Sequence, residues 1–234
     1  MRSDLKPETI ENRWDILYRE YPEVYDEFAS VPYRPNWVAF LGKILGIDWS
    51  GKTVVDVGSG SGLSAFSLAQ RAKFVIGVEP DDQMRELAVK NAGKRNAENV
   101  RFVKGWANAI PLEADSIDVV VAFTASLDYE ESKRIVREGG FLVSIDVAPK
   151  WYGGELAPVI LGKKRVSEGE RERAQKYSEL NFRYKDFFQT QEYGSLEKII
   201  GTYGFIFGKK AIDYLKKHNK TSIKWKWRIH YKKT

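Results

Sequence analysis

Residues 54–62 read VVDVGSGSG, and this stretch decides the fold class. β-Branched residues on both sides of Asp56 predict a short strand, which three glycines within five positions then end. Glycine weakens a regular element, because it packs no side chain and loses more conformational entropy on folding than other residues. The spacing therefore predicts a backbone that turns sharply and lets a ligand approach closely.

The composition indicates a folded protein without a metal site. The chain has 234 residues, of which 43% are apolar, and this is ample for a hydrophobic core. It has no cysteine and only two histidines, His218 and His230, which excludes disulfides and thiolate sites and disfavours metal binding. Neither an apolar membrane-spanning window nor a signal-peptide pattern is present. We therefore expect an unexported, cytoplasmic protein.

Short β-rich segments alternate with segments of helical periodicity from residue 53 to residue 146. Strand, helix and strand in this rhythm are typical of a mostly parallel sheet covered on both faces, with right-handed crossovers. The predicted strands are 53–57, 74–79, 100–104, 117–123 and 140–146, with helices over 63–72 and 81–94.

The rhythm changes after residue 147. Two further strands are predicted, at 182–190 and at 222–231; the second alternates Ile, Trp and Tyr with Lys, Arg and His, as a half-buried antiparallel strand at or near a sheet edge does. The fold class is thus α/β: a Rossmann-like, doubly wound, mostly parallel seven-stranded sheet with a C-terminal antiparallel strand. Other predicted features are an irregular then helical segment at 151–178 and helices at 195–203 and 209–218, separated by a turn around Gly204 and Gly208.

Aromatic side chains are concentrated in residues 1–35, which we expect to form a helical extension. A further helix over 36–45 separates it from the first strand, so the extension must fold back over the domain as a lid. We expect a single domain over 1–234, with this lid, a cofactor-binding core at 36–147 and a substrate-side region at 148–234. The lid aromatics are Trp14, Tyr18, Tyr21, Tyr25, Phe28 and Tyr33.

The glycine loop lies where an open parallel sheet binds its ligands, beyond the carboxyl end of the first strand. A dinucleotide fingerprint needs GxGxxG, but counting from Gly58 the sixth position is Leu63. Asp56 also disfavours a pyrophosphate, which prefers N–H donors to a nearby anion, and it suits a ligand that carries a cation. S-adenosylmethionine (SAM) has an ammonium and a sulfonium and no phosphate. The alternative of an NAD(P)-dependent oxidoreductase is therefore disfavoured.

Four segments of the chain carry a resemblance to a known family. They are VVDVGSGSGLSAFSLAQ (54–70), FVIGVEPDDQMRELAVKNA (74–92), VRFVKGWANAIPLEADSIDVVVAF (100–123) and REGGFLVSID (137–146). In this order and spacing the chain resembles the class I SAM-dependent methyltransferases, especially the ubiquinone and menaquinone biosynthesis group (methyltransferase type 11). The resemblance implies a methyltransferase that uses SAM as its cofactor.

The resemblance also implies a role for each matching residue. Gly58 and Gly60 would let the backbone approach the methionine moiety, and Asp56 would hold its ammonium directly or through water. Glu79 would accept hydrogen bonds from both ribose hydroxyls, and Tyr25 is the best candidate for a lid residue over the cofactor. The cofactor-binding set implied is Tyr25, Asp56, Gly58, Ser59, Gly60, Glu79, Pro80, Met84, Trp106, Ala107 and Phe123, with Pro80 and Met84 walling the adenine.

One position departs from the family pattern. Many relatives have an acid after the third strand that binds the adenine amino group, whereas this chain reads Gly105, Trp106, Ala107. Trp106 either stacks near the adenine or covers the core. Arg34 is a further candidate partner, for the methionine carboxylate.

Methyl transfer is an in-line displacement at carbon, so alignment of the two reactants dominates its catalysis. Positioning contributes about 7 to 11 kcal/mol, and an acceptor with a free electron pair needs no general base. Asp128 or Tyr129 could take a proton from a hydroxyl or amine, although a helix cap and a packing aromatic are their commoner roles. Candidates for the acceptor side are Thr124, Ser126, Asp128, Tyr129, Trp151, Tyr152, Tyr18, Tyr25 and Tyr33.

The charge is concentrated at the C-terminus. From Gly201 onward there are ten basic residues and one acid, a net charge of +9, whereas residues 1–200 carry 28 basic and 31 acidic residues, a net charge of −3. A small-molecule acceptor is the leading hypothesis, and an RNA or protein methyltransferase that uses this basic end is the alternative. A SAM-binding module without catalysis is a further alternative. We expect Trp225 and Trp227 in the core and neither histidine in catalysis.

Overall fold

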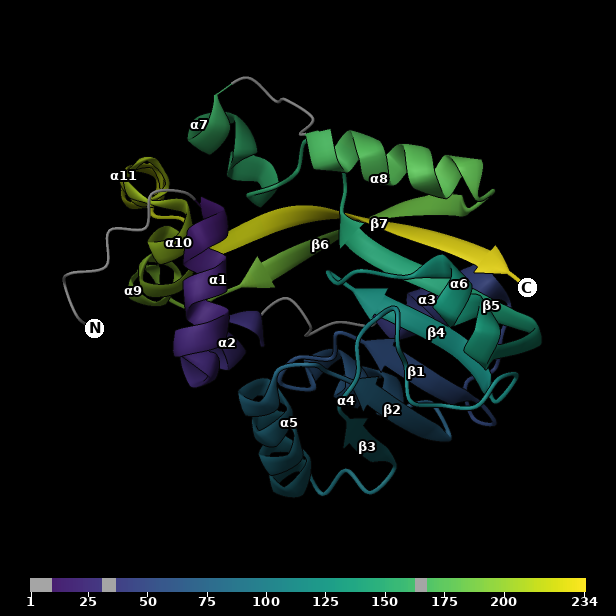
Figure 1. The fold of residues 1–234 in the computed structure, drawn as a ribbon. Helices are drawn as coiled ribbons and strands as arrows, with labels where there is room; N and C mark the ends of the chain where they lie inside the picture. Colours follow the sequence, from purple (N-terminus) through teal and green to yellow (C-terminus); the bar gives the residue numbers. More distant parts are fainter. Residues whose placement is uncertain (1–9, 31–36, 163–167) are drawn as a thin grey trace.

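The computed structural model describes residues 10–30, 37–162 and 168–234, and its centre is one seven-stranded sheet (Figure 1). The strand order is β3-β2-β1-β4-β5-β7-β6. The first five strands pair in parallel, and β7 pairs antiparallel with both β5 and β6. The strands are β1 (Thr53–Val57), β2 (Phe74–Val78), β3 (Val100–Val103), β4 (Ile117–Phe123), β5 (Val136–Val147), β6 (Arg183–Glu192) and β7 (Ser222–Lys233).

The fold class predicted from the sequence is confirmed, with differences at the strand ends. β5 begins four residues earlier than expected, because Val136 pairs with Ile117 before a register shift in the β4–β5 ladder. β7 lies next to the edge, and the edge strand itself is β6. Strand order therefore reverses between β1 and β4, which is where a doubly wound sheet binds ligands.

Helices cover both faces of the parallel part of the sheet. The helix after the glycine loop, α4 (Leu63–Ala69), ends three residues earlier than predicted. Asp81 caps α5 (Asp82–Arg95), because its side chain accepts a 2.9 Å hydrogen bond from the Met84 N–H. The other two helices of this part are α3 (Trp37–Leu45) and α6 (Tyr129–Ile135).

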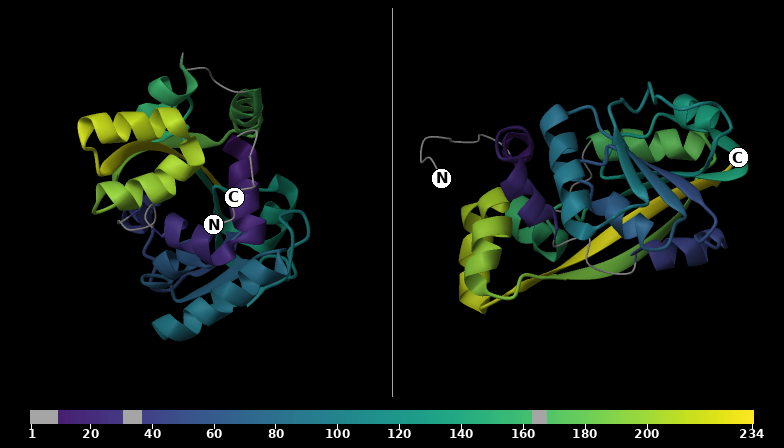
Figure 2. Two further views of the ribbon diagram at one scale, coloured as in Figure 1. Left: turned by 90° about the vertical axis from the view of Figure 1, so that its left-hand side faces the viewer. Right: turned by 90° about the horizontal axis from the view of Figure 1, so that it is seen from below.

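The N-terminal helices α1 (Ile10–Glu20) and α2 (Pro22–Ala29) stand at the carboxyl ends of the parallel strands. Seen from that side, they lie across the strand ends (Figure 2). This is the position that a lid over the ligand site requires. Tyr33 and Arg34, which the sequence also suggested for the site, lie outside the described residues.

The C-terminal part adds a helical cluster next to the lid and one long helix, α8 (Glu168–Glu179), over β6 and β7 (Figure 1). The predicted turn at Gly204 was wrong. A π-helical segment, Ile200–Gly204, continues directly into α10, and Gly204 serves close packing, since a Cβ there would lie 2.8 Å from Ile212 Cγ1. The helices of this part are η1 (Gly154–Leu156), α7 (Ala157–Leu161), α9 (Leu196–Ile199), η2 (Ile200–Gly204), α10 (Phe205–Phe207) and α11 (Lys209–His218).

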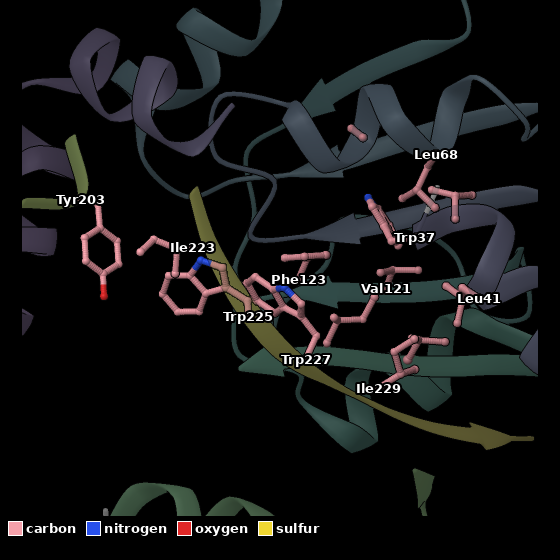
Figure 3. Packing of buried hydrophobic residues seen from close by; sticks show 14 of the residues in the cluster. Trp37, Leu41, Leu68, Val121, Phe123, Tyr203, Ile223, Trp225, Trp227 and Ile229 are labelled. Carbon is pink, nitrogen blue, oxygen red and sulfur yellow. The ribbon is translucent and has the colours of Figure 1, made fainter. Parts of the chain in front are cut away.

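The larger hydrophobic cluster lies on one face of the sheet (Figure 3). The prediction that Trp225 and Trp227 are core residues is confirmed, and Trp227 packs against Phe123, with ring centroids 5.2 Å apart. Trp37 of α3 contacts the same Phe123 ring at 5.2 Å. Because Phe123 is the last residue of β4, this packing fixes the carboxyl end of that strand.

A second cluster covers the opposite face and includes Tyr177 of α8. His230 is on the polar phase of β7, as expected, but it is buried by α8 and stacks on Tyr177 at 4.4 Å. Burial lowers the pKa of His230 to about 4. The imidazole is therefore neutral and belongs to the packing.

Among the helices of the described ranges, none has the length and apolar character needed to cross a bilayer.

Replacing Gly77 with alanine should destabilise the fold. Gly77 lies within β2, and a Cβ there would be 2.6 Å from Phe102 Cε1 and 2.7 Å from Ser59 Oγ. Overpacking of this kind costs about 1–3 kcal/mol, which denaturant titration would measure as a lower midpoint. Gly93→Ala is the matched control, because the space around Gly93 of α5 is open and alanine favours a helix by about 1 kcal/mol. Equal stability of the two variants would contradict this account.

Candidate functional site

The glycine loop, residues 58–62, turns the chain from the end of β1 into α4. Gly58 and Gly62 have φ angles of +68° and +91°, which other residues adopt only at a cost. A Cβ on Gly58 would lie 2.5 Å from the Cβ of Ala125, so the backbone of the loop runs directly against the segment after β4. The N–H groups of Gly58 and Ser59 both donate to Val78 O, at 2.8 and 3.1 Å. The loop is thereby fastened across the end of β2.

A cavity of about 240 Å³ lies over this loop. Its walls come from the loop, the ends of β2 and β4, and the lid helices α1 and α2. Seven predicted cofactor residues line it: Tyr25, Gly58, Ser59, Gly60, Glu79, Pro80 and Phe123. The other lining residues are Tyr18 and Thr124, predicted for the acceptor side, and Ala29, Ser61, Leu63, Ser64 and Ala125, which the sequence analysis did not single out.

Glu79 follows β2 and is the acidic residue of the cavity wall. Its side chain is only 2% exposed, and its two oxygens accept backbone hydrogen bonds, Oε2 from Gly60 N at 2.8 Å and Oε1 from Asp81 N at 2.9 Å. Tyr18 of the lid lines the same cavity. Because the two backbone donors come from the glycine loop and from the cap of α5, the carboxylate is fixed in place by the fold.

Asp56 is fully buried behind the loop and does not line the cavity. Its Oδ2 accepts a hydrogen bond from Ser64 Oγ, whereas its Oδ1 has no hydrogen-bond partner in the described part of the chain. Burial raises the pKa of Asp56 to about 7, against the opposing effect of Ser64. Ser64 lines the cavity, so its hydrogen bond connects the buried Asp56 carboxyl group to the cavity wall. In the sequence, the only sign of this role is the position of Ser64 at the start of the helix after the loop.

Two tyrosines of the lid close the cavity from above. The Tyr18 and Tyr25 rings meet edge to face, with centroids 5.1 Å apart. Burial and the nearby Glu79 raise the pKa of both hydroxyls, that of Tyr25 to about 12. Both hydroxyls therefore remain protonated at neutral pH.

The lid is anchored by side chains that the sequence gave no reason to select. Asn91 of α5 donates to Asp26 Oδ1 at 3.3 Å and to Ser61 O at 3.2 Å, and so joins α2 to the glycine loop. Arg13 of α1 donates to Ile206 O at 2.9 Å. These hydrogen bonds span segments that are far apart in the chain.

Several predicted cofactor residues lie outside the cavity wall. Met84 is buried below the loop, its Cε 3.5 Å from where a Cβ of Gly60 would be. Trp106 is 53% exposed, so it does not cover the core, and neither it nor Ala107 lines the cavity. Their contact with an adenine stays a prediction.

The two candidate proton acceptors have structural roles. Asp128 caps α6, accepting a 2.9 Å hydrogen bond from the Glu131 N–H. The Tyr129 hydroxyl accepts a 3.1 Å hydrogen bond from Lys232 Nζ, and its ring packs on Phe182. Neither residue lines the cavity, and the same is true of Ser126, Trp151 and Tyr152.

Thr124 lines the cavity directly after β4 and has a φ angle of +52°. A β-branched residue in this region is a true outlier, and such strain is concentrated at functional sites. A 2.8 Å hydrogen bond from Thr124 N to Ile145 O holds the conformation. Thr124 is thus the acceptor-side candidate with the strongest structural support.

A separate surface is formed by one face of the β6–β7 ribbon. Tyr184 and Phe188 of the edge strand are 57% and 55% exposed. Lys224 Nζ lies 4.6 Å and Lys226 Nζ 5.8 Å from the Phe188 ring centroid, and the Arg228 guanidinium lies 4.1 Å from that of Tyr184. The basic side chains of β7 therefore lie next to aromatic rings on this face. These rings belong to β6, and Trp225 and Trp227 do not contribute to them.

The chemistry of the cavity fits a positively charged nucleoside. Among the described residues, none of those lining it is a lysine or arginine, while Glu79 lies in its wall and Asp56 behind it. A pyrophosphate would meet the Glu79 carboxylate and no cation here. No group of three or more potential metal-binding side chains occurs within residues 10–30, 37–162 and 168–234.

Comparisons with known proteins agree with this reading. A family described as "Methyltransferase domain" matches residues 54–140. An uncharacterized methyltransferase of Bacillus subtilis, YcgJ, is 31% identical over 42% of this chain and 42% of its own length. A demethylmenaquinone methyltransferase of Lactococcus lactis is 27% identical over 59% of this chain and 60% of its own. The match thus spans about half the length of these relatives.

Solved structures extend the likeness in fold beyond the matched domain. A SAM-dependent methyltransferase from Aquifex aeolicus superposes with a TM-score of 0.51 and 18% identity, over 97% of this chain and 98% of the other. Residues 54–140, which include the glycine loop and Glu79, are thus similar to the methyltransferase domain family, and the chain has the fold of a SAM-dependent methyltransferase.

Proposed function

We propose that the protein transfers a methyl group from SAM to a small-molecule acceptor. The observation that carries this proposal is the fixed Glu79 carboxylate in a cavity that has no basic residue among its described lining. In this proposal the N-terminal lid, the core and the C-terminal region act as one domain around the cavity.

The cavity residues would hold the cofactor at three points. Glu79 would accept hydrogen bonds from the ribose hydroxyls, and the loop at Gly58 and Gly60 would lie against the methionine moiety. Asp56 would stabilise the ammonium group of the methionine moiety through Ser64, because the Ser64 hydroxyl joins the Asp56 carboxyl group to the cavity wall. SAM, when bound, supplies a methyl group activated by its positively charged sulfur.

The chain itself would contribute alignment and the exclusion of water. The tyrosine hydroxyls of the lid stay protonated, so they orient groups and do not act as bases. Asp128 and Tyr129 are engaged elsewhere in the fold. This favours an acceptor with its own free electron pair, such as an amine, a thiol or a stabilised carbanion, placed near Phe123 and Thr124. The Lactococcus lactis relative, named a demethylmenaquinone methyltransferase, is consistent with a small acceptor.

Glu79→Ala should weaken cofactor binding at least tenfold, because the ribose would lose its acceptor; each factor of ten corresponds to about 1.4 kcal/mol. Calorimetric titration with SAM and with S-adenosylhomocysteine measures this, with NAD as the control ligand. Glu197→Ala, at an exposed position of α9, is the matched control variant. Unchanged affinity in Glu79→Ala would remove Glu79 from the site. Binding of NAD instead of SAM would overturn the proposed function.

Asp56→Asn should stabilise the unliganded protein at pH 8 while weakening its binding of SAM. The folded-state pKa of Asp56, about 7, lies above the ordinary 3.8, so this group's contribution to stability is complete at low pH and is lost as the pH rises through 7. At pH 8 the neutral amide should therefore gain about 2–4 kcal/mol.

Thermal unfolding at pH 8 and at pH 4 tests this expectation. The gain should be large at pH 8 and nearly absent at pH 4, where the carboxyl group is protonated in the folded state. A gain of equal size at both pH values would show that charge burial is not its cause.

An RNA acceptor is the second candidate, and the basic aromatic face of the β6–β7 ribbon favours it. Exposed rings next to lysine and arginine are the usual platform for single-stranded nucleic acid, because bases stack on the rings and phosphates pair with the cations. The face is defined by Tyr184, Phe188, Lys224, Lys226 and Arg228.

If this candidate is right, a fluorescently labelled single-stranded RNA should bind with an affinity that falls steeply between 50 and 200 mM salt, by about 0.7 in log K per unit of log salt for each phosphate contacted. Phe188→Ala should weaken the binding by about 1–3 kcal/mol. Lys209→Ala on α11 is the control, since it removes a charge elsewhere. A flat salt response in fluorescence anisotropy would exclude this candidate.

A further inference from the structure

The buried face of α5 carries a polar side chain at the point where the lid meets the glycine loop. The buried residues of this helix are Met84, Leu87, Ala88 and Asn91, at the i, i+3, i+4 and i+7 spacing of an apolar stripe. An aliphatic side chain in place of Asn91 would bury more apolar surface. Because a buried amide is costly unless it is hydrogen-bonded, the partners of Asn91 indicate what this polar position contributes.

The side-chain NH2 group of Asn91 donates to two segments that form the cavity. Its Nδ2 lies 3.3 Å from Asp26 Oδ1 of the lid and 3.2 Å from Ser61 O of the glycine loop. A carboxylate and a carbonyl are both acceptors, so the NH2 group of the amide, and not its oxygen, has to face them. Because the two protons of a planar amide have a fixed geometry, Asn91 sets the position of the lid carboxylate relative to the loop carbonyl.

Both partners of Asn91 belong to the parts of the chain that close the cavity. Ser61 lines the cavity itself, and Asp26 directly follows Tyr25, which lines it from the lid. The ring of Tyr25 contacts Trp14 and Tyr18 of α1, and these contacts hold the two lid helices to each other. The hydrogen bonds of Asn91 instead hold the lid helix that carries Tyr25 to the glycine loop.

An ion pair joins the same two helices at the surface. Lys90 Nζ of α5 lies 3.1 Å from Glu23 Oε1 of α2, and the two side chains are 57% and 74% exposed. An exposed ion pair contributes little, because water screens the charges and both long side chains lose conformational entropy. This pair involves no residue of the glycine loop, so it offers a comparison for the buried hydrogen bonds of Asn91.

We propose that Asn91 is a positioning residue of the cofactor site, which couples the position of the lid to the conformation of the glycine loop. Asn91 does not line the cavity, so it acts through Ser61 and Asp26. A cofactor that holds the loop in its binding conformation favours the docked lid, and a docked lid favours cofactor binding in return, because coupling between two sites is reciprocal. This proposal rests on the proposed function, which assigns the cavity to SAM.

Calorimetric titration with S-adenosylhomocysteine tests the coupling on the whole chain. Asn91→Asp keeps the shape of the side chain but turns acceptors toward both partners, so it should bind the ligand about tenfold more weakly, as expected for the loss of a hydrogen bond to a charged group. Asp26→Ala removes the lid bond alone, at a partly exposed position, and should weaken binding about fivefold. Lys90→Gln, the matched control, removes the exposed tie between the same helices and should bind as the unmodified protein does.

A swap of the two polar groups separates the coupling from a loss of stability. In the double variant Asn91→Asp with Asp26→Asn, donor and acceptor of the lid bond change places, so this bond forms again and the affinity should recover in part.

Thermal unfolding without ligand records the stability of each variant. Variants that unfold at a lower temperature but bind S-adenosylhomocysteine as tightly as the unmodified protein would show that Asn91 only packs the helix, and would overturn the proposal. A swap without any recovery would also contradict it. If Asn91→Asp does not fold, Asp26→Ala carries the same test. Failure of the unmodified protein to bind S-adenosylhomocysteine at all would instead overturn the proposed function, and this inference with it.

Discussion

The site depends on one constraint: the Glu79 carboxylate is held between two backbone N–H groups from different elements. Gly60 N belongs to the loop after β1 and Asp81 N to the cap of α5, so the hydrogen bonds form only when β1 and β2 are paired in register. Charge-assisted bonds of this kind are stronger than neutral ones. They explain how an acidic side chain stays oriented while almost fully buried.

Asp56, in contrast to Glu79, is a buried acid whose hydrogen bonding is incomplete. Its carboxyl group has one oxygen bonded to Ser64 and one without a hydrogen-bond partner among the described residues, and burial raises its pKa to about 7. A charge in this position is a cost to the empty protein, because desolvation is not offset by a cation. The two acids thus differ in kind: both oxygens of Glu79 accept hydrogen bonds from the backbone, whereas only one oxygen of Asp56 has a partner among the described residues.

Sequence reasoning was most accurate where the signal is local. The five parallel strands and the glycine loop follow from periodicity and glycine spacing over a few residues. It was weaker where packing decides. Gly204 suggested a turn, yet it lies in a π-helical segment, because Ile212 needs the space that a side chain would fill. Tyr184 and Phe188 gave no signal, since their exposure depends on β6 being the edge strand.

The sequence by itself determined the sheet, the loop and the acids at its edge, because strand periodicity, glycine conformation and the sign of a charge are properties of neighbouring residues. Only the tertiary structure decided which residues share the cavity. It brought Tyr18 and Glu79 to the wall of one cavity, placed Ser64 between Asp56 and the cavity, and left Trp106 outside. The physical reason is that hydrogen bonds and burial between distant segments depend on how the lid and the sheet pack, which no local pattern records.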